Sequence, residues 1–367
     1  MSAPDIIAPL SVYIHWPYCK SKCPYCDFFK HVNPHVNQEE IVASYIKELD
    51  YYHNLVPNRI IRSVFFGGGT PSLLKPELIN KILDHIAHLW SFEPDTEISL
   101  EANPNSEYPD MFAQLKQAGI NRLSLGVQAL NDNDLRFLGR THNLKQALHS
   151  IEQVLKTFNN HSADIIYSRP DQTLKSWEDE LKLLTSFGFK HLSLYQLTIE
   201  EGTVFAAKNI KIPDESAAAD MYRFTVNTLH NNGYPRYEVS NFASETFESK
   251  HNKCYWLGDD YIGIGESAHG RLKIGNLNYA LQHPHLSEKL SAEERAEELI
   301  IMGLRLQNGI NKKHFHEICG LNFDEFVNAE ALDMLIKNNL ITNTADTVSA
   351  TDDGFLLLNR IITELCV

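Results

Sequence analysis

Three cysteines near the start of the chain carry the most specific chemistry in this sequence. Cys19, Cys23 and Cys26 follow the pattern Cys-x-x-x-Cys-x-x-Cys. Three thiolates on one short loop suit three corners of a four-iron, four-sulfur cube, and the fourth iron is then left without a protein ligand. The spacing therefore predicts a [4Fe-4S] cluster with one iron open to a small chelating molecule.

Two simpler interpretations of the triplet exist. A zinc site needs a fourth ligand, which His15, His31 or Asp27 could supply, but structural zinc sites usually bring their ligands in two separated pairs. A disulfide would leave an odd thiol, and residues 1–9 lack the basic start and long apolar middle of a signal peptide. The iron–sulfur interpretation is therefore favoured.

Length and charge bound the class of protein. The chain has 367 residues, of which 43% are hydrophobic, so it can bury a large core and form one large domain with a smaller one appended. Its 47 acidic and 33 basic residues give a net charge of −14, which repels nucleic acid and anionic membrane surfaces. We expect a cytoplasmic protein with no nucleic-acid partner and no integral membrane segment; transient membrane-associated partners remain compatible with these features.

Short apolar runs alternate with segments of helical period, which is typical of repeated βα units around a parallel sheet. Six strands are predicted at residues 11–15, 63–66, 97–101, 122–127, 163–167 and 191–197, with helices at residues 38–52, 76–89 and 174–187 among those between them. The predicted fold class is α/β, a partial (β/α)6 barrel with a smaller C-terminal α+β domain. In parallel βα barrels the chemistry gathers at the C-terminal ends of the strands.

Polar or glycine-rich positions follow several of these strands. They are Gly68, Gly69 and Thr70 after the second strand, Glu101 at the end of the third, and Gln128 and Arg140 after the fourth. Each has a structural explanation of its own, such as a tight turn, a cap or a surface charge. Together they predict a ligand site, in which the glycines let the backbone approach a small molecule and Arg140 clamps a carboxylate.

The cysteine motif and its strand-end companions resemble those of the radical S-adenosylmethionine (SAM) superfamily, specifically its coproporphyrinogen dehydrogenase-like branch. This resemblance implies that SAM chelates the open iron, that Gly68, Gly69 and Thr70 hold its amino group, and that Glu101 binds its ribose hydroxyls. Tyr25 would lie near the adenine. The remaining implied SAM contacts are Tyr13, Phe28, Gln128, Arg140 and Asp164.

Two features are similar to the HemW family of haem chaperones rather than to the dehydrogenase itself. Phe28 stands where the dehydrogenase has a fourth cysteine, and His251 to Trp256 match the HNxxYW motif that is associated with haem binding. His251, Tyr255 and Trp256 are thus the implied haem residues, because a neutral imidazole beside aromatic surface suits haem iron. Cys254 is an alternative axial ligand, and a core histidine between aromatic neighbours is the structural alternative.

The chain also departs from this family pattern. Relatives usually have YGLPGQT after the fifth strand, whereas residues 167–173 here read YSRPDQT. Two glycines are lost, and Arg169 and Asp171 are expected beside the SAM site. Glu266 and Ser267 likewise stand where relatives have smaller or stiffer residues.

Three parts are predicted: a radical SAM partial barrel at residues 1–215, a barrel extension with the HNxxYW motif at 216–290, and a winged-helix-like cap at 291–367. In the cap, helices are expected at 292–306 and 353–365, with a strand at 340–342. The resemblance implies a haem chaperone that binds a [4Fe-4S] cluster, SAM and haem and delivers haem to acceptor haemoproteins, without coproporphyrinogen dehydrogenase activity.

Two other functions compete with this one. The first is an oxygen-independent coproporphyrinogen III oxidase-like radical SAM enzyme, in which the cluster reduces SAM and the resulting radical attacks a propionate side chain; Phe28 argues against it. The second is RNA modification by radical SAM chemistry, which the acidic balance disfavours.

Overall fold

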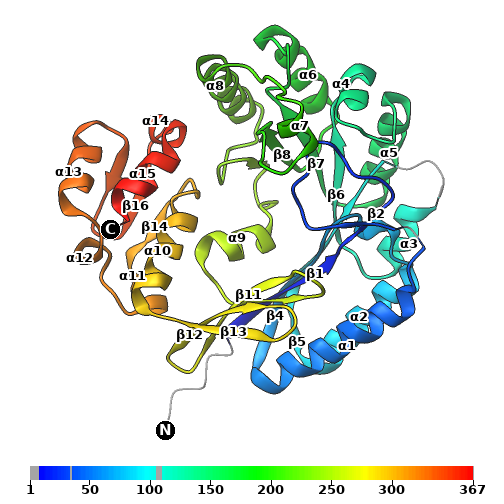
Figure 1. Ribbon diagram of the computed structural model, residues 1–367, viewed down its shortest axis with the longest axis horizontal. Helices are drawn as coiled ribbons and strands as arrows, with labels where there is room; N and C mark the ends of the chain where they lie inside the picture. Colours follow the sequence, from blue (N-terminus) through cyan, green and yellow to red (C-terminus); the bar gives the residue numbers. More distant parts are fainter. Residues whose placement is uncertain (1–7, 34, 105–109, 367) are drawn as a thin grey trace.

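Six parallel strands form the centre of the protein. The structure, a computed structural model, describes residues 8–33, 35–104 and 110–366, so most of the N-terminal segment inspected for a signal peptide lies outside it. The strands pair in chain order, which confirms the partial barrel (Figure 1). They are β1 (Ala8–Trp16), β4 (Arg59–Gly68), β5 (Ser91–Ala102), β6 (Arg122–Gln128), β7 (Asn160–Tyr167) and β8 (His191–Gln196).

Further strands extend both edges of this sheet. At one edge β9 (Asn241–Ala243) pairs antiparallel with β8. At the other edge β10 (Tyr261–Ile264) pairs parallel with β1, and β11 (His269–Ile274), β12 (Leu277–Gln282) and β13 (Leu286–Leu290) continue as antiparallel neighbours. The sheet therefore has 11 strands in the described chain.

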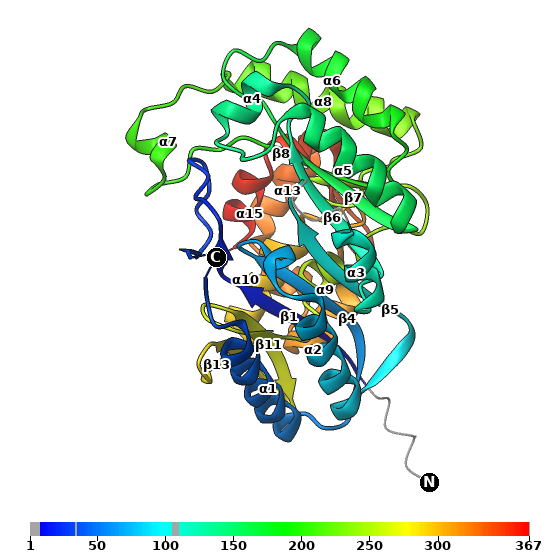
Figure 2. The same cartoon turned by 90° about the vertical axis from the view of Figure 1, so that its right-hand side faces the viewer.

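Amphipathic helices cover the outer face of the strands (Figures 1 and 2). The structure confirms the three helices named from the sequence, as α1 (Gln38–Leu55), α2 (Pro76–Leu89) and α6 (Leu174–Ser186). The other helices of this part are α3 (Met111–Gln117), α4 (Asp132–Phe137), α5 (Leu144–Thr157), α7 (Val204–Ala207) and α8 (Glu215–Asn231). Capping boxes at Asn143 and Thr173 fix the starts of α5 and α6.

The inner face of the barrel is polar. Each of the six parallel strands contributes a buried serine, namely Ser11, Ser63, Ser99, Ser124, Ser162 and Ser193. Small hydroxyl side chains leave room inside the barrel and need hydrogen-bond partners there, as Ser63 finds in Ser11 at 2.8 Å. The barrel interior is thus built to hold polar groups.

The C-terminal part packs around its own hydrophobic cluster. It contains α10 (Ala292–Gly303), β14 (Ile310–Asn311), α11 (Lys312–Cys319), α12 (Phe323–Phe326), α13 (Ala329–Lys337), β15 (Ile341–Asn343), β16 (Thr347–Ala350), α14 (Asp352–Leu356) and α15 (Leu358–Leu365). Its strands form a separate sheet in the order β14-β16-β15. The helix predicted at 353–365 is in fact two helices that meet at Leu357. The division of the chain at residues 215 and 290 stays a prediction.

Among the described residues, no helix is long and apolar enough to span a membrane.

Candidate functional site

A cavity of about 560 Å³ opens at the C-terminal ends of the barrel strands. The cysteine loop forms one wall and the strand ends form the others. The predicted residues that line it are Cys19, Cys23, Cys26, Tyr25, Phe28, Gly68, Gly69, Thr70, Glu101, Gln128, Arg140 and Asp164. Residues far apart in the sequence therefore converge on one space large enough for a small ligand.

Two of the three thiols have hydrogen-bond donors from the strand ends. Thr70 Oγ1 donates to Cys19 Sγ, and Arg140 Nη1 donates to Cys23 Sγ, each at 3.5 Å. Burial raises the pKa of the Cys19 thiol, and the Thr70 hydrogen bond offsets part of that effect. Hydrogen bonds to cluster sulfur ligands are one means by which proteins tune iron–sulfur potentials.

Arg140 connects the cysteine loop to the strands. Its guanidinium also donates to Tyr25 Oη at 3.3 Å, to the Gly126 carbonyl at 3.1 Å and to Asn103 Oδ1. Its buried Nε has no hydrogen-bond partner among the described residues. An unpaired buried donor on a guanidinium that contacts Cys23 fits an anionic group in the cavity, so the residues present suit a cluster with a carboxylate-bearing ligand.

Two carboxyl groups, those of Glu101 and Asp164, line the cavity and interact electrostatically. Burial and the nearby Asp164 raise the pKa of Glu101 from 4.5 to about 8, although a hydrogen bond with the Gly68 backbone opposes the shift. Burial also raises the pKa of Asp164, which accepts a hydrogen bond from Ser124 Oγ at 2.9 Å. Such shifted carboxyl groups in a cavity are typical of ligand sites.

The glycine run has a packing role that the sequence did not reveal. A Cβ at Gly69 would lie 2.8 to 2.9 Å from backbone atoms of Trp16, Pro17 and Tyr18, which lead into the cysteine loop. Gly68 has φ of +107° and a Cβ there would meet the His15 ring at 2.6 Å. The turn therefore presses directly on the cysteine loop, and its contact with a small ligand stays a prediction.

Gln128 adopts an uncommon backbone at the end of β6. Its φ is 70°, in the left-handed region that side chains other than glycine rarely occupy. A Cβ at Gly126 would lie 2.8 Å from Gln128 Nε2. Gly126 thus leaves room for this amide, a role that was not predicted although the glycine lies within the strand end.

Tyr13 lies outside the cavity lining, inside the barrel. Its hydroxyl hydrogen-bonds to His15 Nδ1 at 2.9 Å, and its ring stacks on Phe65. Direct contact between Tyr13 and SAM stays a prediction.

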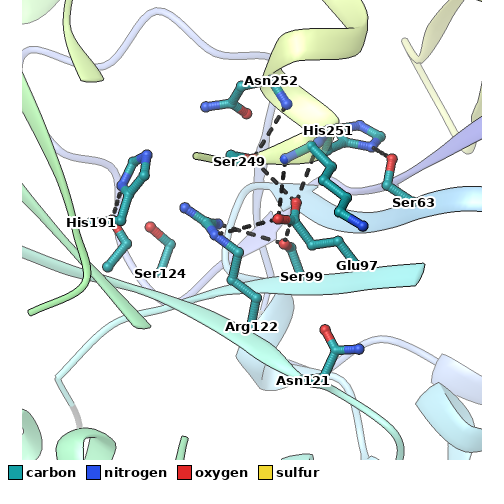
Figure 3. Close-up of polar contacts among 12 residues, drawn as sticks. Ser63, Glu97, Ser99, Asn121, Arg122, Ser124, His191, Ser249, His251 and Asn252 are labelled. Carbon is teal, nitrogen blue, oxygen red and sulfur yellow. Dashed lines mark hydrogen bonds and ion pairs between the residues drawn. The ribbon is translucent and has the colours of Figure 1, made fainter. Parts of the chain in front are cut away.

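The HNxxYW residues form α9 (Lys250–Leu257), which inserts its N-terminus into the barrel interior (Figure 3). The carboxylate of Glu97 receives hydrogen bonds from Ser249 Oγ and the Lys250 N–H, both at 3.1 Å, and from the His251 N–H at 3.3 Å. Arg122 lies 3.9 Å from the same carboxylate. A buried anion thus holds the helix by its N-terminus, a favourable place for negative charge. Glu97 was not among the residues predicted from the sequence.

His251 is fully buried, at 0% exposure, and both ring nitrogens have partners. Nδ1 hydrogen-bonds with Ser63 Oγ at 2.8 Å and Nε2 with Tyr255 Oη at 2.6 Å. Burial lowers the pKa of His251 to about 3, so the ring is neutral as expected. Cys254 is also buried, and Trp256 lies against α10 and β14. In this conformation the motif does not present an open imidazole or thiol to a haem iron.

The loop after β7, residues 168–172, is placed differently from what the sequence predicted. Arg169 is buried and pairs with Glu180, and its Nη2 lies 3.0 Å from Asp134. Residues 168–172 are absent from the described cavity lining. The prediction that Arg169 lies beside the SAM site is therefore wrong, because the arginine points inward and anchors α6, and Asp171 is exposed outside the described cavity lining.

Comparison with known proteins agrees with this geometry. Residues 13–184 match the radical SAM superfamily, and residues 290–357 match the HemN C-terminal domain. The solved structure of coproporphyrinogen III oxidase (HemN) from Escherichia coli, a radical SAM enzyme, superposes with a TM-score of 0.80 at 23% identity, covering 98% of this chain and 91% of that one. That likeness supports the fold.

Curated relatives are similar over nearly the whole chain. Heme chaperone HemW of Haemophilus influenzae is 34% identical over 97% of both chains, and that of Buchnera aphidicola subsp. Schizaphis graminum is 33% identical over 97% of this chain and 98% of its own. The mitochondrial radical S-adenosyl methionine domain-containing protein 1 of Mus musculus is 35% identical over 84% of this chain and 75% of its own. This chain belongs to the HemW family of the radical SAM superfamily.

Proposed function

We propose that this protein is a haem chaperone of the HemW type, which binds a [4Fe-4S] cluster, SAM and haem in the cytoplasm and passes haem to acceptor haemoproteins. The observation that carries the proposal is the convergence of three thiols and a strand-end polar set on one cavity, in a chain about one-third identical to named haem chaperones.

Cys19, Cys23 and Cys26 would hold the cluster, whose open iron supplies a chelation site for the amino and carboxylate groups of SAM. Arg140 orients the cysteine loop and offers its unpaired Nε to an anionic group. Glu101 is suited to the ribose hydroxyls, because an ionised carboxylate accepts two hydrogen bonds. The other proposed SAM contacts are Tyr13, Tyr25, Phe28, Gly68, Gly69, Thr70, Gln128 and Asp164.

Porphyrinogen decarboxylation is the competing function, since HemN shares the fold. Phe28 speaks against it, because its side chain lines the cavity where the dehydrogenase motif continues to a fourth cysteine. The proposal therefore includes no coproporphyrinogen dehydrogenase activity.

The test is anaerobic reconstitution of the whole chain with iron and sulfide, followed by haem titration and a parallel assay of coproporphyrinogen III decarboxylation with SAM and reductant. We expect the wild-type protein to form a cluster and a stable haem complex, to transfer haem to an apo-haemoprotein, and to show no decarboxylation. The Cys23→Ala variant should lose the cluster. Decarboxylation without haem binding would reverse the assignment.

A further inference from the structure

The proposed function needs a haem-iron ligand, and the motif expected to supply it is closed. His251 is fully buried with both nitrogens hydrogen-bonded, and Glu97 fixes the start of its helix inside the barrel. A porphyrin is far larger than any opening that a rotamer change at this position would create. An accessible imidazole elsewhere on the chain is a better candidate.

The cysteine loop carries an exposed apolar strip, defined here as Phe28, Phe29 and Val32. Their exposed fractions are 65%, 42% and 54%. Phe28 also lines the cavity, so the strip runs outward from the rim of the proposed cluster site. Neighbouring large apolar side chains left in water mark a binding surface, and a flat macrocycle gains most from aromatic contact.

His31 lies within this strip. Its ring meets Phe29 edge-on at 5.1 Å and lies 5.7 Å from the ring of Tyr18. Its side chain is 44% exposed. A half-exposed imidazole among aromatic rings has the access that His251 lacks.

A carboxylate orients the His31 ring. Nε2 lies 3.0 Å from Glu266 Oε2, so the Nε2 proton is directed to the carboxylate and the Nδ1 lone pair remains available to a metal. Carboxylate partners of this kind fix the tautomer of ligating histidines and raise their basicity. Glu266 is one of the departures from the family pattern, and this contact gives it a role.

We propose that His31, oriented by Glu266 and flanked by the cluster-loop strip, is the axial ligand of haem on this chain. The inference rests on the proposed haem-binding function and assigns its iron ligand. Haem then lies beside the iron–sulfur site, with one face against Phe28, Phe29 and Val32.

The experiment is titration of the reconstituted full chain with ferric haem, read by the Soret band and by haem loss to apomyoglobin. We expect His31→Ala to shift the Soret band and to speed haem loss by about tenfold or more, while iron content stays at the wild-type level. We expect the pairing of β2 (Tyr18–Cys19) with β3 (His31–Val32) to be kept, because it is made by the backbone and not by the His31 side chain. Glu266→Ala should keep the wild-type Soret band but weaken binding about tenfold.

His85→Ala is the matched control, because His85 is a surface histidine paired with Asp50 at 2.7 Å on α1 and α2, away from the strip. It should leave the Soret band and haem loss unchanged. An unchanged spectrum and off-rate in His31→Ala would overturn the inference, and a change in His251→Ala with retained iron would return the ligand to the motif. In both of these outcomes the wild-type protein still binds haem, and only the assignment of the ligand changes. If the wild-type protein bound no haem, the proposed function itself would be refuted.

Discussion

Ser168 combines a left-handed backbone with a buried hydroxyl that lacks a partner. Its φ is 59°, it is fully buried, and its Oγ has no hydrogen-bond partner among the described residues. The left-handed conformation costs roughly 1–2 kcal/mol for a side chain other than glycine, and an unsatisfied buried hydroxyl costs about 1–3 kcal/mol. Glycine at this position would avoid both costs but lose about 0.5–1 kcal/mol to backbone entropy.

We therefore expect Ser168→Gly to raise the free energy of unfolding by about 1–2 kcal/mol, measured by urea denaturation. Asp171→Gly is the comparison, because Asp171 has φ of 58° but is exposed, so the change relieves backbone strain alone. The free energy of unfolding should rise less in Asp171→Gly than in Ser168→Gly. A loss of stability in Ser168→Gly would mean that the serine has a partner in solution.

Glu101 makes stability depend on pH in the direction opposite to an ordinary ion-paired carboxylate. Its pKa in the folded protein is about 8, against 4.5 ordinarily, so the folded state holds the proton while the unfolded chain releases it. The stability present below pH 4.5 is therefore lost as the pH rises, and the loss levels off only once the pH has passed the folded pKa of about 8. Each pH unit within this window lowers the free energy of unfolding by about 1.4 kcal/mol. In urea unfolding, the free energy of unfolding of Glu101→Gln should rise relative to that of the wild type between about pH 5 and 9. If the two free energies depended on pH in the same way, this prediction would be contradicted.

The same raised pKa predicts proton release when SAM binds. At pH 7 the Glu101 carboxyl is mostly protonated, and binding the ribose hydroxyls favours the ionised form. Isothermal titration at pH 7 in two buffers with different ionisation enthalpies should give different apparent enthalpies for the wild type. Glu101→Gln should bind SAM more weakly and show a smaller buffer dependence, because only the proton lost by the chelating amino group of SAM then remains to be released. Equal release from both proteins would place the titrating group elsewhere.

Residue types at strand ends were enough to predict the cavity wall, because parallel strands bring their C-terminal ends to one edge. Glu97 was missed because its role depends on a contact across the barrel, with α9 lying 152 to 154 residues away, and the role of Gly126 was missed because it depends on the left-handed backbone of Gln128. Local spacing in the sequence reveals neither the long-range contact of Glu97 nor the backbone conformation of Gln128.

At the scale of elements, the turn after β4 and the cysteine loop form one packed unit. The Gly69 N–H donates to the Trp16 carbonyl at 2.7 Å, and the Thr70 N–H donates to the Tyr18 carbonyl at 3.0 Å. A methyl group at Gly69 would clash with this backbone. We expect Gly69→Ala to displace the loop and lose most of the iron after anaerobic reconstitution, measured by iron content and visible absorption.

Gly188→Ala controls for the general cost of replacing a glycine, since Gly188 has φ of +77° and open space around its Cβ position. It should bind the wild-type amount of iron with only a modest loss of stability. Full iron in Gly69→Ala would show that the loop adapts, and the glycine run would then serve another purpose.

Of all the elements, α9 is the one whose position the sequence predicted least well. Its motif implied a haem-binding imidazole beside aromatic side chains, with a core histidine as the structural alternative, and the helix lies between the barrel and the C-terminal part (Figure 1). The cause is electrostatic, because the buried Glu97 carboxylate needs hydrogen-bond donors and the start of α9 supplies three of them. The helical pattern of the sequence predicts that α9 has an apolar face, but it does not show which part of the protein packs against that face.

In the whole molecule, one buried arginine joins the barrel side to the C-terminal part. Arg236 donates to Gln307 Oε1 at 2.9 Å, to the Tyr222 hydroxyl at 2.7 Å and to Asp352 at 2.8 Å, and its guanidinium lies 3.6 Å from the centre of the Phe355 ring. These partners come from α8, the loop after α10 and α14, so the contacts span the junction between the two hydrophobic clusters.

Removing Arg236 should therefore loosen the C-terminal part and leave the cluster site intact. Arg236→Ala deletes the stacked guanidinium and leaves Gln307 and Tyr222 without their charged partner, at a cost of about 1–3 kcal/mol. We expect faster amide hydrogen exchange and proteolysis in residues 291–367, with unchanged iron content. Asp352→Asn is the matched control, because this carboxylate is 81% exposed and its ion pair is worth at most about 1 kcal/mol. Uniform exchange across the chain in Arg236→Ala would instead show that barrel and C-terminal part unfold as one cooperative unit.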